Sequence, residues 1–410
     1  MSSRSHLRVA PFLLACTFLG VGPIASDVRA QQVISMSVSV GGSTQAAAGS
    51  MVTKRFLDRV AKVAGMSPEQ AEQAGVIHDG YASAYETRRK AHREALDEAR
   101  RASEDTGDFS AFMERVPGLE KSFRDDSVSL EADFLKDVRS LLTPTQESAW
   151  PKVERMRRRD VGLPAGSISG ESIDVIALVD ELDLAATDRA AIDPVLESYE
   201  LELDRMMVAR LEGRGDREGW TPGKPVDIEE MQASMAKAKE EGIKVRDLHR
   251  DAARKVEALL PEGLRASFRE RVQSASFPRV YRKGRTLREL EAAAGMTDLD
   301  QSQRSQVADL LASYQRDAAP LNAAWAKAIE TSEDDGQAGG AGGGVVLSFG
   351  NDPEELQQAR KARRELDEQV SKRLRSMLSD GQRDRLPKAG QGGGEEGELE
   401  GNAVIIRRAE

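Results

Sequence analysis

Residues 142–146 read Leu-Thr-Pro-Thr-Gln, and this stretch decides how the chain folds. Thr143 stands where a helix cap is needed, Pro144 suits the first helical position, and Gln146 follows three residues after the cap. The hydroxyl and the amide can then satisfy free backbone N–H groups reciprocally, as a capping box. The sequence therefore predicts that a helix begins here, behind the apolar anchor Leu142.

The same feature recurs along the chain at fixed spacing. Each of three segments opens with an apolar residue, has a tyrosine 15 positions later and reaches a second opener after 76, 76 or 79 positions. The three sets are Met66, Tyr81 and Leu142, then Leu184, Tyr199 and Leu260, then Leu299, Tyr314 and Leu378. Equal offsets between segments of little identity are typical of tandem duplication, so we predict three copies of one structural unit.

Four of the six openers carry the whole helix-cap motif. They are Met66, Ser67 and Gln70; Leu142, Thr143 and Gln146; Leu299, Asp300 and Gln303; and Leu378, Ser379 and Gln382. The openers at Leu184 and Leu260 keep the leucine and lose the cap. We interpret the motifs as helix caps beneath apolar anchors, not as ligand contacts.

Each unit is predicted to be a long helical hairpin. Apolar residues recur every three or four positions after the first opener and again before the second. Turn-forming residues separate the two stripes at 106–108, 213–225 and 336–344. The expected fold class is therefore all-α, with three tandem long helical hairpins joined by flexible linkers.

The expected organisation follows from these boundaries. It comprises a signal peptide at 1–30, a flexible segment at 31–55, hairpin unit 1 at 56–160, a linker at 161–174, unit 2 at 175–285, unit 3 at 286–388 with a glycine-rich insert at 336–344, and a disordered tail at 389–410. Short β-like runs at 33–40, 345–349 and 404–406 leave strand pairing open.

The first 30 residues have the features of an export signal. Arg4 and Arg8 precede an apolar run over 9–25, and small residues lead to a cleavage site after Ala30. We expect a periplasmic or secreted protein with no membrane span. An alternative reading makes Cys16, the only cysteine, a lipoprotein site. Removal of the signal leaves no cysteine, which excludes disulfides and thiol chemistry.

Paired motifs of the form L-[T/S/D]-x-x-Q, bracketing a helical hairpin behind an export signal, resemble the Spy/CpxP (LTxxQ motif) family of small periplasmic helical proteins. The resemblance covers about residues 56–390, as three family-sized units. It implies an all-α fold and an ATP-independent holdase chaperone or envelope-stress modulator, whose partners are unfolded or envelope proteins. Members of the family dimerise, and the oligomeric state of a fused triplicate is left open.

Charge also bears on the class of partner. Loss of residues 1–30 removes three basic residues and one acidic residue from 59 and 69, which leaves 56 and 68 and a net charge of −12. Nucleic acid is therefore not an expected partner. A surface of cations and adaptable apolar side chains suits unfolded clients. The candidate client-binding residues are Arg88, Arg89, Arg155, Arg158, Met206 and Met207. The alternative is an ordinary charged helix surface with methionines in the seams.

The sequence predicts no enzyme, and no catalytic, cofactor or metal site. His78 falls on an apolar helix face, and His92 and His249 lack ligand spacing around them. The leading hypothesis is a holdase-like chaperone or stress modulator of the cell envelope. The alternatives are a structural spacer or scaffold with one dedicated envelope partner, and metal-responsive sensing through these histidines.

Overall fold

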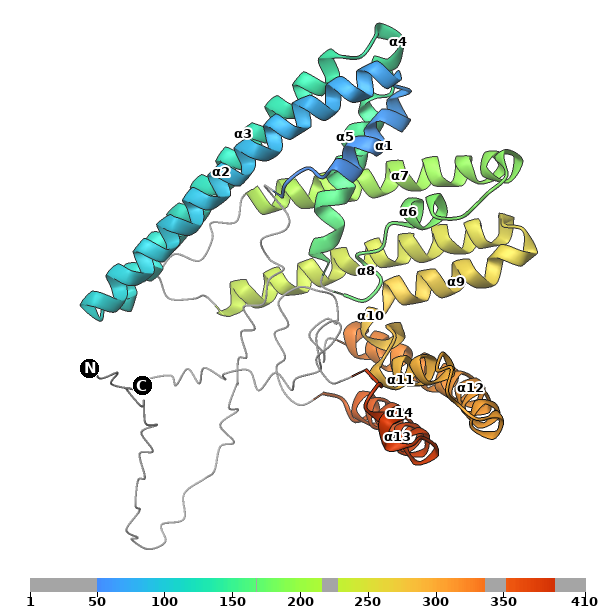
Figure 1. Ribbon diagram of the computed structural model, residues 1–410. Helices are drawn as coiled ribbons and strands as arrows, with labels where there is room; N and C mark the ends of the chain where they lie inside the picture. Colours follow the sequence, from blue (N-terminus) through green and yellow to red (C-terminus); the bar gives the residue numbers. More distant parts are fainter. Residues whose placement is uncertain (1–49, 167, 216–227, 336–351, 388–410) are drawn as a thin grey trace, which may run out of the picture. The chain divides into compact units, whose positions relative to one another are not determined.

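The computed structural model describes residues 50–166, 168–215, 228–335 and 352–387 (Figure 1). All regular secondary structure in these residues is helical, without a strand, so the predicted all-α fold class is confirmed. The predicted signal peptide at 1–30, the β-like runs at 33–40, 345–349 and 404–406, the glycine-rich insert at 336–344 and the tail at 389–410 lie outside the described residues.

Three pairs of long helices dominate the described residues. α2 (Pro68–Thr106) packs along α3 (Phe109–Ser140), α7 (Ala186–Gly215) along α8 (Ile228–Leu259), and α12 (Gln301–Asp334) along α13 (Glu354–Met377) (Figure 1). The pairs fall within the regions predicted to be hairpin units. Their origin by tandem duplication stays a prediction.

Shorter helices precede and follow these pairs. α1 (Lys54–Ala64), α6 (Val175–Asp180) and α11 (Arg285–Ala294) precede them, and α4 (Pro144–Glu147), α5 (Trp150–Gly162), η1 (Leu163–Ala165), α9 (Glu262–Ser276), α10 (Pro278–Tyr281) and α14 (Asp380–Arg383) follow. The sequence prediction overlooked α1 as an element. Thr53 caps α1 by accepting from the Phe56 N–H, and Val52 is fully buried, so the last residues of the predicted flexible segment at 31–55 are packed in the structure.

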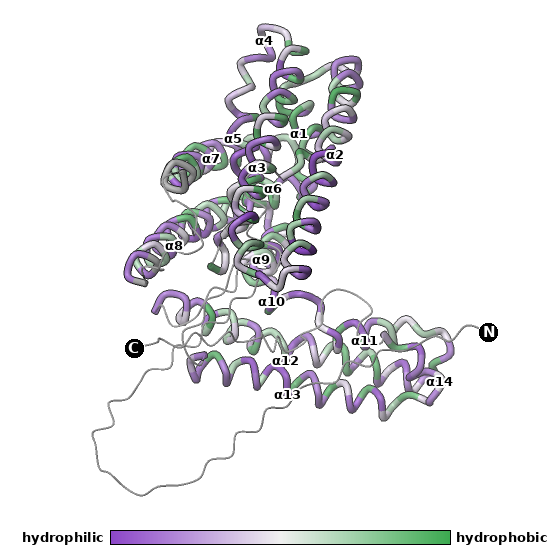
Figure 2. Tube along the Cα trace, turned by 90° about the vertical axis from the view of Figure 1, so that its left-hand side faces the viewer, coloured by the Kyte–Doolittle hydropathy of each residue, from purple (hydrophilic) through white to green (hydrophobic). Residues whose placement is uncertain are grey.

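Each long pair encloses its own apolar cluster. Hydrophobic residues recur between hydrophilic ones along every long helix (Figure 2), as expected for helices that bury one face. Tyr81, Tyr199 and Tyr314 lie one in each cluster and are all at most 5% exposed. A smaller cluster joins α10 to α12 and α13.

The predicted linker at 161–174 is not a free spacer. α5 continues to Gly162, and Ile168, Glu171 and Ile173 are buried against the second pair. Glu171 explains this burial, because its carboxylate pairs with Arg210 and accepts the Ile168 N–H at 3.1 Å. A buried carboxylate needs such partners. Here the pair with Arg210 fixes residues 161–174 against α7.

Candidate functional site

The four complete cap motifs form capping boxes, at Ser67 and Gln70, Thr143 and Gln146, Asp300 and Gln303, and Ser379 and Gln382. At Ser67, Thr143 and Asp300 the cap side chain accepts the backbone N–H three residues on. In all four boxes the glutamine side chain accepts the backbone N–H of the cap residue. The motifs therefore start α2, α4, α12 and α14.

The two boxes of the first pair also bind each other. Gln70 Nε2 donates to Gln146 Oε1 at 2.9 Å and to the Leu141 carbonyl at 2.6 Å. Gln146 Nε2 donates to Gln70 Oε1 at 3.0 Å and to the Gly65 carbonyl at 2.6 Å. With the two capping bonds, each amide uses its full donor and acceptor capacity. We call this reciprocal pair of amides the glutamine clasp.

A second glutamine clasp joins Gln303 to Gln382, with longer amide–amide distances of 3.2 and 3.5 Å. The second helix pair has Asp188 and Leu264 at the corresponding positions. The N-cap residue of its α9 is Pro261, which makes no side-chain hydrogen bond to the helix. Both glutamines are missing there together, which fits a device in which each amide needs the other as its partner.

Met206 and Met207 lie on α7, where both contact the apolar cluster of the second helix pair. Met207 is 2% exposed within the cluster of the second pair, and Met206 is half-buried against the same cluster. Burial of Met207 in this seam favours the alternative of a methionine that fills the core, and its contact with clients stays a prediction. A methionine is well suited to filling an irregular seam, and it contacts Gly162 so closely that a Cβ there would lie 2.8 Å from its sulfur.

Arg88 and Arg89 lie on α2, where their contacts are local. Arg88 is half-buried and reaches back to the Ala84 carbonyl at 3.5 Å, and Arg89 makes two bonds to Glu86 at 2.7 and 3.0 Å. Pairs three residues apart on an exposed helix are ordinary surface features. These two arginines do not lie with the other candidates in one site.

Arg155 and Arg158 lie on α5 and are held by carboxylates of α7. Arg155 binds Glu200 at 3.1 Å, and Arg158 binds both oxygens of Asp204 at 2.7 and 3.0 Å. They join the first helix pair to the second, which the sequence prediction did not foresee. Glu200 and Asp204 stand one turn apart on α7, a spacing that would have indicated an acidic stripe.

We call this contact of the α5 arginines with Glu200 and Asp204 of α7 the joint, and Arg159 is its buried centre. Its side chain is 5% exposed and binds Asp174 at 2.9 Å and Glu200 at 2.8 Å. Burial opposes the positive charge, but the two carboxylates outweigh that effect and raise the pKa of the guanidinium. Breaking one partner would leave a charge uncompensated in a low-dielectric environment, so the joint is sensitive to single substitutions.

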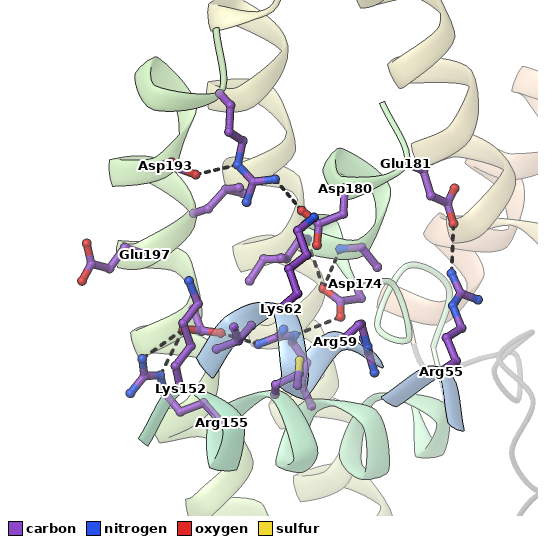
Figure 3. A pocket seen from close by; sticks show the side chains of 18 residues that line it. Arg55, Arg59, Lys62, Lys152, Arg155, Asp174, Asp180, Glu181, Asp193 and Glu197 are labelled. Atoms are coloured by element: carbon purple, nitrogen blue, oxygen red, sulfur yellow. Dashed lines mark hydrogen bonds and ion pairs between the residues drawn. The ribbon is translucent and has the colours of Figure 1, made fainter. Parts of the chain in front are cut away.

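The joint borders a cleft of about 740 Å³ between α1, α5, α6 and α7 (Figure 3). Its walls differ in charge. The side formed by α1 and α5 contributes Arg55, Arg59, Lys62, Lys152, Arg155 and Arg159, whereas the side formed by α6 and α7 contributes Asp174, Asp180, Glu181, Arg189, Asp193, Glu197 and Glu200. Val63 and Met156 on one wall and Ile176, Ala177 and Leu196 on the other also line the cleft, and we call these apolar side chains the apolar strip. A cleft of this kind suits a ligand with both charged and apolar groups.

The three histidines lie in separate environments. His78 Nε2 is 2.9 Å from the Val52 carbonyl, and His92 stacks on Phe123 at 4.6 Å between ring centroids. His249 is fully buried, where desolvation lowers its pKa to about 4. In the part of the chain that the structure describes, no three or more His, Cys, Asp or Glu side chains gather as metal ligands.

Comparison with protein-family models, with curated proteins and with solved structures finds no match to this chain. Within the described ranges, no helix combines the length and apolar character needed to cross a bilayer.

Proposed function

We propose that this protein is an exported, non-enzymatic scaffold or spacer of the cell envelope that binds one dedicated partner protein. The observation that supports this choice most is the burial of the apolar seams. Each long helix pair directs its apolar residues into its own cluster, and the large hydrophobic side chains left exposed among the described residues are few. A scaffold needs ordered helices and one specific contact, and this distribution suits both.

A holdase needs a contiguous, adaptable apolar surface. The large hydrophobic side chains that are exposed among the described residues are Val76, Phe109, Val128, Leu201 and Leu259. They are spread over α2, α3, α7 and α8, and isolated apolar side chains are normal on any protein surface. This scatter favours the scaffold over a general binder of unfolded chains.

A holdase or envelope-stress modulator is the second candidate, and one feature favours it besides the motif resemblance. Phe109 is 65% exposed where α3 begins, with the ring of Phe112 at 5.7 Å between centroids. Two neighbouring aromatic rings at the turn of a helix pair offer a small apolar contact for a client.

Two assays on the mature chain separate these functions. In the first, a chemically unfolded client is diluted into equimolar to several-fold excess protein without ATP. The scaffold proposal expects no suppression of aggregation. In the second, pull-down from an envelope fraction should yield one stable complex.

Suppression of aggregation that is lost on Phe109→Ser would overturn the scaffold in favour of a holdase. Val128→Ser, a change of another exposed apolar residue on α3, is the matched control.

A further inference from the structure

We propose that the cleft between α1, α5, α6 and α7 docks an extended segment of the partner protein in which acidic and aliphatic side chains alternate. The inference rests on the proposed scaffold function and names the surface and the chemistry of its partner. Three features of the cleft carry it: the charge that remains after internal pairing, the apolar strip, and an unused donor.

Most charges of the cleft neutralise one another. Glu200 forms ion pairs with Arg155 and Arg159, and Asp174 also pairs with Arg159. Arg189 pairs with Asp180 and Asp193. Arg55 pairs with Glu181, and Arg59 pairs with Asp160. Lys62 on α1 and Lys152 on α5 have no partner among the described residues. Glu197 has none either, and it projects away from the group in Figure 3. The side chains facing a guest therefore carry excess positive charge on the α1–α5 wall.

The apolar strip gives a guest more than ion pairing. Met156 and Leu196 are each 4% exposed, while Val63, Ile176 and Ala177 are half-buried and accessible. Aliphatic side chains of a guest would cover these groups and gain from the area removed from water. A small inorganic anion would use the lysines and leave the strip uncovered.

Arg59 supplies the unused donor. Its guanidinium binds Asp160 through Nη2, but its buried Nε has no acceptor among the described residues. A buried N–H without an acceptor is unfavourable. Rotation of the Arg59 side chain, which is 30% exposed, would present it to a carbonyl or carboxylate oxygen of a bound segment. A polypeptide offers such an oxygen at every residue.

The test measures fluorescence anisotropy of a dye-labelled octapeptide of alternating glutamate and leucine, titrated with the full mature chain. The double variant Lys62→Ala/Lys152→Ala should bind about two- to thirtyfold more weakly, as expected for the loss of two exposed ion pairs. Lys90→Ala/Lys121→Ala removes the same charge from exposed positions of the first helix pair and should bind as the wild type does. All four lysines are exposed, and circular dichroism checks that both variants are folded.

Two further peptides define the chemistry. Serine in place of leucine should weaken binding by removing the apolar contact, and lysine in place of glutamate should abolish it. Equal weakening in both double variants, or equal binding of the lysine peptide, overturns the cleft proposal. So does the absence of binding by the glutamate–leucine peptide. In each case a single stable envelope complex that survives Lys62→Ala/Lys152→Ala would leave the scaffold function standing and place its contact elsewhere.

Discussion

Removing one amide of the first glutamine clasp should destabilise the first helix pair far more than removing an exposed glutamine from the same helix. Gln70→Ala deletes four hydrogen bonds. Gln70 Oε1 accepts the Ser67 N–H at 2.8 Å, Nε2 donates to the Leu141 carbonyl, and two bonds join the amide to Gln146. Gln73 is exposed on α2, so Gln73→Ala is the matched control.

The magnitude follows from the number and the burial of these bonds. Each half-buried bond contributes about 0.5–1 kcal/mol net, so the loss of four bonds in Gln70→Ala should lower the free energy of unfolding by about 2–4 kcal/mol. Gln73→Ala should stay within about 0.5 kcal/mol of wild type. Because Gln70 and Gln146 share two bonds, the double variant Gln70→Ala/Gln146→Ala should fall short of the sum of the single effects by about 1–2 kcal/mol.

Native-state hydrogen exchange read by mass spectrometry is the suitable assay, since three helix pairs need not unfold in one transition. Peptides from α2 and α3 report the first pair, and peptides from α12 and α13 provide an internal reference. Strict additivity of the two substitutions, or equal effects of Gln70→Ala and Gln73→Ala, would refute the reasoning. The longer amide–amide distances between Gln303 and Gln382 predict a smaller coupling there.

Local chemistry made the helix starts predictable. A hydroxyl or carboxylate at the cap and a glutamine three residues later need no tertiary information to form a capping box. The clasp required more, because Gln70 and Gln146 meet only if α3 returns alongside α2 to the end of the pair where α2 begins. The repeated offset of 76 or 79 positions held that information, but the caps themselves did not.

The short helices α1 and α11 could also have been predicted, because the residues before two of the apolar openers resemble each other. Residues 55–66 read RFLDRVAKVAGM and residues 285–296 read RTLRELEAAAGM, with a shared Ala-Gly-Met ending and a shared leucine. Both stretches precede or end at the apolar residues that open the predicted units, so they lie outside the spacing that defines the repeat. In the structure these stretches are α1 and α11, which pack on α2 and α12.

The role of the α5 arginines could not be read from the sequence. Arg155 and Arg158 look like any exposed cations on a helix, and helix surfaces are commonly charged. Whether they face solvent or Glu200 and Asp204 depends on how α5 meets α7. Residues 161–174 decide that approach, and their buried Glu171 was unexpected in a stretch whose composition is typical of a linker.

Two further predictions concern that buried segment. Gly242→Ala would place a Cβ 2.8 Å from Glu171 Oε2 and should lower the stability of the second pair by about 1–3 kcal/mol, whereas Gly263→Ala, which meets no atom within 4 Å, should be nearly neutral. His249 gives a pH dependence. Its pKa of about 4 in the folded state lies below the ordinary 6.5, so the unfolded chain binds the proton more readily. Stability should therefore fall as the pH drops from 6.5 towards 4, by about 3 kcal/mol in all. Hydrogen exchange of α8 at pH 7 and 5 measures this loss, of which about 2 kcal/mol falls in that interval. His249→Gln, which cannot take up the proton, should show a smaller loss, and an unchanged loss in that variant would assign the pH dependence to other groups.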